Sequence, residues 1–175
     1  MALTNRLEAG DAEKEKKFTL KGGIKMDKLD SFDDVLDYAI DREIEANQFY
    51  KDLAKKMKNP AMREVFEAFA REELGHKARL EAMKHSKKIQ AAKSVTDLQI
   101  ADYVIDIKPT PDMSYQDALI LAMKKEKVSF RLYLDLADEV ENEDQKAIFL
   151  SIAQEEAKHK LRFEIEYDDV ILKQN

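Results

Sequence analysis

The 175-residue chain has the length of a single domain, and 44% hydrophobic residues are enough to build a core. The net charge of −6, with acids and bases interspersed, argues against nucleic-acid binding, and the absence of cysteine excludes a disulfide framework, a thiolate iron site and a cysteine nucleophile. No apolar run approaches the roughly 20 residues of a membrane span and the first residues contain no signal-peptide core, so we expect a cytoplasmic protein without a membrane partner.

Residues 1–30 form a polar, lysine-rich stretch that we expect to be an N-terminal extension, separate from a domain over residues 31–175. Lys21-Gly22-Gly23 is encoded by AAR-GGN-GGN, which resembles a ribosome-binding sequence, and it lies shortly before Met26. We therefore hypothesise that the cellular protein starts at Met26. The alternative is a genuine N-terminal arm that packs on a neighbouring molecule.

The next two elements are predicted to be antiparallel helices. Ser31, with Asp34 three residues later, resembles a capping box, and an apolar stripe with helical spacing runs from there to about residue 58. Asn59 and Pro60 supply a cap and a first-turn proline for a second helix. The pattern then lapses at about residue 87.

Residues 87–113 are too long for an ordinary connection in a compact domain. A helix of 27 residues is about 40 Å long, and a segment of this length can return the chain over that distance. We therefore predict a long crossover. Ser114 and Asp117 then open a third helix that ends near residue 140, and a fourth helix is predicted from about residue 143 to 171.

Two copies of a Glu-x-x-His pattern indicate an internal repeat. Glu73 and His76 recur as Glu156 and His159 after a shift of 83 residues. The same shift superimposes many other identical residues: Ser31 on Ser114, Asp34 on Asp117, Glu43 on Glu126, Tyr50 on Tyr133, Glu72 on Glu155 and Arg79 on Arg162. Two copies without insertions predict a duplicated helical hairpin and hence an all-α four-helix bundle.

Polar residues occupy six positions that the helical spacing assigns to the core. They are Glu43, Glu73, His76, Glu126, Glu156 and His159. Buried carboxylates without partners would cost several kcal/mol each, and cations are the simplest compensation. One Glu from each of two helices plus Glu-x-x-His from each of the other two is the ligand set of a carboxylate-bridged dinuclear metal site.

The oxygen-rich donor set favours two iron ions, with manganese or zinc as alternatives. The imidazoles must be neutral to bind metal, so metal affinity should fall as the pH drops through about 6.5. A buried ion-pair network is the other interpretation of the six residues, but the apolar stripes contain no Arg or Lys beside the acids.

Tyr50 and Tyr133 each lie seven residues after one of the single glutamates, on the same helix face. They are the candidates for a catalytic role, because their hydroxyls can hydrogen-bond carboxylates around the metal site. Ordinary core aromatics are the alternative.

In these residues the chain resembles the di-iron domain of rubrerythrins, in the ferritin-like superfamily, over about residues 31–172. The resemblance implies a four-helix bundle with a long crossover, two irons bridged by Glu73 and Glu156, reaction with hydrogen peroxide or dioxygen, and a homodimer. Rubrerythrins also carry a rubredoxin domain with four cysteines, and this chain has none. Electrons would therefore come from a separate donor protein such as a rubredoxin. Ser129 stands where the family usually has a further Glu.

The leading hypothesis is a di-iron oxidoreductase that reduces peroxide or dioxygen. Iron oxidation and handling, as in ferritins, is the first alternative, and a metal-stabilised interaction domain is the second.

Overall fold

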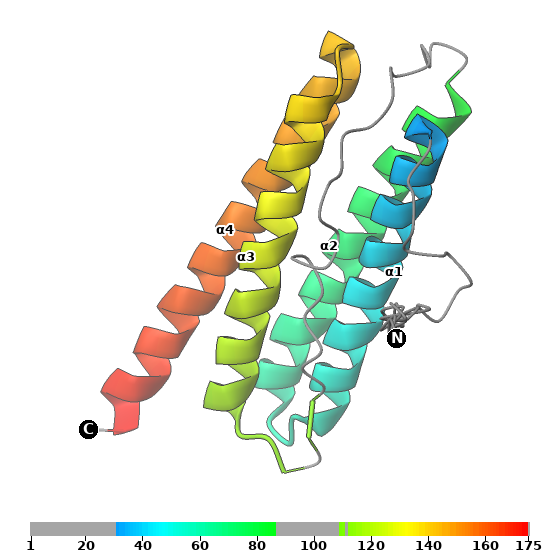
Figure 1. Cartoon of the computed structure of the whole chain (residues 1–175). Coiled ribbons are helices and arrows are strands. Elements are labelled where there is room, and N and C mark those ends of the chain that lie inside the picture. The colour runs from blue at the N-terminus through cyan, green and yellow to red at the C-terminus, as the bar shows by residue number, and fades with distance from the viewer. Residues whose placement is uncertain (1–30, 87–108, 111, 175) are drawn as a thin grey trace, which may run out of the picture.

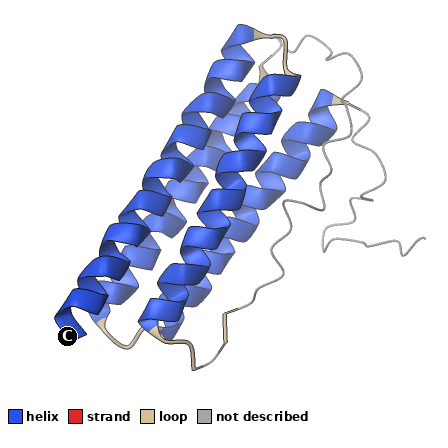
Figure 2. Ribbon diagram, turned by 60° about the vertical axis from the view of Figure 1, so that its left-hand side comes forward, coloured by secondary structure: helices blue, strands red, loops and turns tan. Residues whose placement is uncertain are grey.

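A computed structural model describes residues 31–86, 109–110 and 112–174, and these form four α-helices without a strand (Figure 2). The helices are α1 (Phe32–Lys56), α2 (Pro60–His85), α3 (Tyr115–Glu139) and α4 (Glu143–Gln174). The four predicted helices are confirmed, although α1 ends at Lys56 rather than near residue 58 and α4 continues to Gln174 rather than to 171. The proposed extension, the Met26 start and most of the predicted crossover lie outside the described residues.

The predicted caps explain why the helices begin where they do. Ser31 Oγ accepts a hydrogen bond from Asp34 N (3.2 Å), and the Asp34 carboxylate accepts one from Ser31 N (2.9 Å). Ser114 Oγ accepts from Asp117 N (3.0 Å) in the second repeat. Asn59 caps α2, whose first residue is a proline. These bonds satisfy backbone donors that a helix start leaves free.

The helices pair into two hairpins, α1 with α2 and α3 with α4 (Figure 1). In Figure 1, α1 runs from the top to the bottom, α2 returns to the top, and α3 again starts at the bottom. The end of α2 and the start of α3 therefore lie at opposite ends of the bundle, as a long crossover requires. With the two hairpins, this confirms the predicted ferritin-like architecture.

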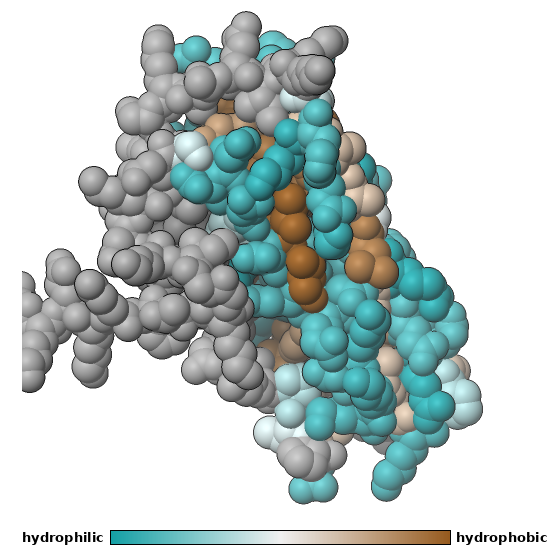
Figure 3. Space-filling view, turned by 90° about the vertical axis from the view of Figure 1, so that its right-hand side faces the viewer, coloured by the Kyte–Doolittle hydropathy of each residue, from teal (hydrophilic) through white to brown (hydrophobic). Residues whose placement is uncertain are grey.

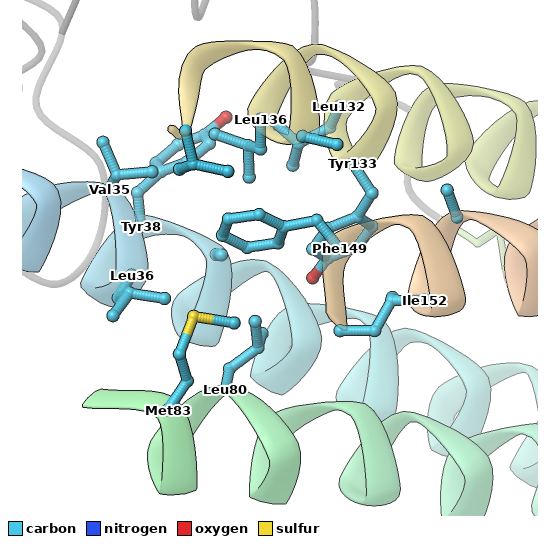
Figure 4. Packing of buried hydrophobic residues seen from close by; sticks show 14 of the residues in the cluster. Val35, Leu36, Tyr38, Leu80, Met83, Leu132, Tyr133, Leu136, Phe149 and Ile152 are labelled. Carbon is cyan, nitrogen blue, oxygen red and sulfur yellow. The ribbon is translucent and has the colours of Figure 1, made fainter. Parts of the chain in front are cut away.

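Two apolar clusters fill the bundle. One lies at the end where α1 begins and includes Leu36, Leu80, Leu136, Phe149 and Ile152 (Figure 4). The other lies toward the opposite end and includes Leu53, Phe66, Phe69, Leu119 and Phe163. Fully burying each such side chain contributes about 1.5–3 kcal/mol, so two apolar layers hold the bundle together. The six polar core positions fall between these layers.

On the face that Figure 3 shows, the described residues are largely hydrophilic, with local apolar strips. Five large hydrophobic side chains are well exposed among the described residues: Ile44, Leu74, Leu150, Leu161 and Ile165. Three of them lie on α4. None of the described helices has an apolar stretch that could span a membrane.

Candidate metal centre

All six predicted polar residues lie buried in the middle of the bundle, and each helix contributes. Glu43 comes from α1 and Glu126 from α3, while α2 supplies Glu73 with His76 and α4 supplies Glu156 with His159. Each of these residues is at most 2% exposed. Helical spacing explains the arrangement, because residues three apart project from one face about a turn apart.

The six side chains form two overlapping groups of potential ligands. Glu43, Glu73, His76 and Glu156 form one group, and Glu73, Glu126, Glu156 and His159 form the other. Within each group, the ligand atoms lie within 4.8 Å of one another.

Glu73 and Glu156 belong to both ligand groups, and each directs its two carboxylate oxygens to different histidines. Glu73 places Oε2 3.1 Å from His76 Nδ1 and Oε1 3.8 Å from His159 Nδ1. Glu156 places Oε1 3.0 Å from His76 Nδ1 and Oε2 3.4 Å from His159 Nδ1. Each shared carboxylate thus offers one oxygen to each group.

Most polar side-chain atoms at the centre have no hydrogen-bond partner in the part of the chain that the structure describes. These atoms are Oε2 of Glu43, Glu73 and Glu126, both carboxylate oxygens of Glu156, and Nδ1 of both histidines. Orphaned buried polar atoms carry a desolvation cost of about 1–3 kcal/mol each, more when the group is charged. Two divalent cations would balance four carboxylates and give these lone pairs a partner. The donor set therefore fits a pair of metal ions.

The pKa shifts that the protein groups cause in one another also favour bound cations. Burial raises the pKa of Glu73, and the neighbouring charge of Glu156 raises it further. Burial also raises the pKa of Glu126. Burial opposes the charged form of His159, but Glu126 and Glu156 outweigh it and raise its pKa to about 11. Protons thus occupy the cluster when only protein charges are present, and metal ions would displace them.

Tyr50 and Tyr133 connect the two repeats. The Tyr50 hydroxyl donates to Glu126 Oε1, and the Tyr133 hydroxyl donates to Glu43 Oε1. Both tyrosines are fully buried. Their acceptors are the inward-facing glutamates themselves rather than outer carboxylates, and each acceptor belongs to the other repeat.

Two outer carboxylates, Glu72 and Glu155, hold the histidines, and neither was among the predicted site residues. Nε2 of His76 lies 3.1 Å from Glu155 Oε2, and Nε2 of His159 lies 2.9 Å from Glu72 Oε2. A carboxylate only accepts, so each Nε2 carries a hydrogen, and the nitrogen that would lose its proton to bind a metal ion is Nδ1, on the side of the centre.

Arginines fix these outer carboxylates in turn. Arg79 donates twice to Glu155 (2.8 and 2.7 Å), and Arg162 donates to Glu72 (2.8 Å). The repeat contains the signal that could have identified them, because both glutamates and both arginines recur at the 83-residue shift. Cross-helix partners, however, can be assigned only once the helix pairing is known.

Ser129 lies on α3 one turn after Glu126 and is half-buried. Its position in the first repeat is held by Ala46. The described site thus has four inward-facing glutamates, two per repeat, and no fifth at this position.

Comparison with known proteins agrees with this geometry. The family model described as Rubrerythrin matches residues 34–168, most of the chain. The chain belongs to the rubrerythrin family. No curated protein matches the sequence.

Two solved structures share the fold of this rubrerythrin-family chain. A putative ferritin-like diiron-carboxylate protein from Thermotoga maritima has a TM-score of 0.62 at 21% identity, covering 80% of this chain and 96% of that one. A hypothetical protein from Pyrococcus furiosus has a TM-score of 0.58 at 26% identity, covering 78% and 87%. Both cover the helical bundle rather than a small part of it.

Proposed function

We propose that the protein holds two iron ions and reduces hydrogen peroxide or dioxygen with electrons from a separate donor. The observation that carries this proposal is the pair of shared carboxylates, Glu73 and Glu156, each offering one oxygen to either ligand group. When bound, two irons that cycle between ferrous and ferric states supply the two electrons that peroxide needs, in H₂O₂ + 2e⁻ + 2H⁺ → 2H₂O. Family membership supports the same assignment.

The protein groups would position and balance this pair of ions. Glu43 and Glu126, which each belong to one ligand group, would each hold one ion, and the hydroxyls of Tyr133 and Tyr50 fix one oxygen of each carboxylate. The same hydroxyls lie beside the centre, and burial raises the pKa of Tyr133, so this hydroxyl keeps its proton and continues to donate to Glu43. The apolar layers above and below exclude bulk water, which strengthens the electrostatic interactions inside.

Anaerobic iron loading followed by peroxide addition tests the proposal. We expect two irons per chain and consumption of one peroxide per two ferrous ions. His76→Gln should lower the iron content, whereas His85→Gln should not, because His85 is exposed and its Nδ1 lies 2.7 Å from the carbonyl oxygen of Glu81, outside the two ligand groups.

The alternatives give different results in the same experiment. Retention of many irons per chain in an assembled shell would assign the protein to iron storage instead. Two bound ions that react with neither peroxide nor dioxygen would make it a metal-stabilised interaction domain. A cytoplasmic location and a homodimer remain predictions.

A further inference from the structure

The outer side of α4 carries exposed apolar residues at the spacing of a helix-packing stripe. Leu150, Leu161 and Ile165 are 41%, 54% and 56% exposed, and they are three of the five large hydrophobic side chains exposed on the described surface. Together with the smaller and polar residues between them, they recur every three or four positions, which keeps them on one side of the helix. We call these residues the α4 stripe: Ala147, Leu150, Gln154, Ala157, Leu161 and Ile165, all of them exposed.

A groove next to the α4 stripe extends the apolar surface to α3. Figure 1 shows α4 at the edge of the bundle, beside α3. The groove between them has a volume of about 590 Å³, and its lining includes Phe130 and Leu134 of α3 with Ala147, Leu150 and Ala157 of the stripe. The two alanines are small, so the groove has room for a side chain from outside. Contiguous exposed apolar surface of this kind is typical of a protein-binding site.

The matching helix of the first repeat shows that the bundle does not require this apolar stripe. At the 83-residue shift, Ala147, Leu150 and Gln154 correspond to three charged residues of α2, which are Glu64, Glu67 and Arg71. Glu64 and Arg71 form an exposed ion pair there (2.8 Å), as on an ordinary solvated surface. Both helices have the same place in their hairpins, so packing inside the bundle does not account for the leucines of α4.

The charges along one flank of the α4 stripe are self-complementary. Lys146 and Glu164 are 18 residues apart, which is five helical turns, so both lie on the same flank. Lys146 precedes Gln154 by eight residues and Glu164 follows it by ten. Two antiparallel α4 helices related by a twofold axis near Gln154 would therefore place Lys146 of each copy near Glu164 of the other. A parallel pair would place like charges together, which is unfavourable.

Large and small residues of the stripe also match across such an axis. Leu161 lies seven residues after Gln154, and Ala147 lies seven residues before it. Leu150 lies four residues before Gln154, and Ala157 lies three after it. Each leucine of one copy thus meets an alanine of the other, and this alternation of large and small side chains lets two surfaces interdigitate.

We propose that two copies of the chain associate through the α4 stripe and the adjoining groove, with their α4 helices antiparallel. This gives the predicted homodimer a specific surface, on α4 and α3 and not on α1 or α2. Burial of the exposed leucines stabilises the pair, and the two contacts between Lys146 and Glu164 select the antiparallel direction. Glu164 already pairs with Lys160 of its own chain, and its carboxylate has a second oxygen for the other copy. The association does not depend on the proposed function, because no metal ligand takes part in it.

Sedimentation equilibrium of the full chain, at concentrations from about 0.1 to 100 μM, tests the surface. Leu150→Glu should weaken association by roughly tenfold or more, because it places a charge in an apolar contact. Leu74→Glu is the matched control, since Leu74 is 45% exposed and occupies the position of Ala157 in the first repeat. It should change the association constant by less than about twofold, as expected for a surface substitution outside the contact.

Charge reversal tests the antiparallel direction. Lys146→Glu and Glu164→Lys should each weaken association by roughly tenfold, because each brings like charges together. Both substitutions in the same chain should restore the association constant to within about twofold of the unmodified value, since the two contacts then form with their charges exchanged. This rescue cannot result from a change in folding alone.

Several outcomes would overturn the surface. An unmodified chain that stays monomeric at about 100 μM would do so, and so would equal effects of Leu150→Glu and Leu74→Glu. A double charge reversal that associates no better than the single variants would refute the antiparallel arrangement. Iron content is the independent readout, and it should be the same in all variants because the α4 stripe lies outside the two ligand groups. Loss of iron together with association would assign the effect to the metal centre and contradict the proposed surface.

Discussion

Removing the Tyr133 hydroxyl should destabilise the metal-free protein. Tyr133 donates to Glu43 Oε1, and the other oxygen of Glu43 has no hydrogen-bond partner. Tyr133→Phe would remove the one hydrogen bond that the described structure gives this buried carboxylate, whose other oxygen lies 3.4 Å from His76 Nδ1. A hydrogen bond to a charged group contributes about 1.5–3 kcal/mol. For a domain of this size that loss corresponds to a drop of about 3–12 °C in melting temperature.

Tyr38→Phe is the matched control, because Tyr38 is as well buried as Tyr133 and its hydroxyl has no hydrogen-bond partner among the described residues. It should leave stability unchanged or raise it. Denaturant unfolding of both metal-free variants measures the difference as a change in midpoint at constant m-value. In the metal-loaded protein the Tyr133→Phe effect should shrink, because the ion satisfies Glu43. Equal destabilisation by both variants would show that ring packing, and not the bond to Glu43, accounts for the loss.

Three further outcomes are expected. The pKa of His159 is raised to about 11 and that of Glu73 is also raised. The stability that these groups contribute to the metal-free protein is complete below their unfolded pKa values, about 6.5 for His159 and 4.5 for Glu73, and is lost as the pH rises through the raised values. The melting temperature of the metal-free protein should therefore fall toward alkaline pH. Metal-loaded protein should not share this fall, and parallel curves from pH 6 to 10 would argue against metal binding at these groups. Gly75→Ala should stabilise the protein by about 0.5–1 kcal/mol, and calorimetry showing destabilisation would mean that the site is not open. Ser129→Glu should add a carboxylate beside Glu126 and raise steady-state peroxide turnover, whereas Ser129→Ala should change turnover little; loss of turnover in Ser129→Ala at full iron content would make the hydroxyl itself part of the reaction.

The helices and the six inward polar residues were predictable because both follow from local spacing. The capping residues Ser31 and Ser114 mark helix starts, and an apolar stripe interrupted by Glu and His at helical spacing identifies a polar centre within a core. Repetition made the prediction stronger, since a shift of 83 residues aligns both halves of the site. None of this requires knowledge of how the hairpins pack.

The hydrogen-bond partners could not be predicted, because they depend on which helices face each other. Tyr50 reaches Glu126 on α3, and Glu72 on α2 meets His159 on α4. Spacing along one helix contains no information on these contacts. Spacing along one helix also led us to expect the ordinary imidazole pKa of about 6.5 for the pH dependence of metal binding. The carboxylates around His159 raise its pKa well above the usual imidazole value, and only the assembled cluster shows this.

Each ligand group draws residues from both repeats: Glu156 completes the group of the first hairpin, and Glu73 completes that of the second. A single hairpin therefore contains no whole metal position, and its tyrosine has no glutamate to bind within its own half. The ancestral unit, before duplication, could have held metal only as a pair of identical chains. Fusion of two such chains would have turned an association that depended on concentration into one that does not. It also freed the halves to diverge, and the surface positions of Gly75 and Lys158 are one place where they did.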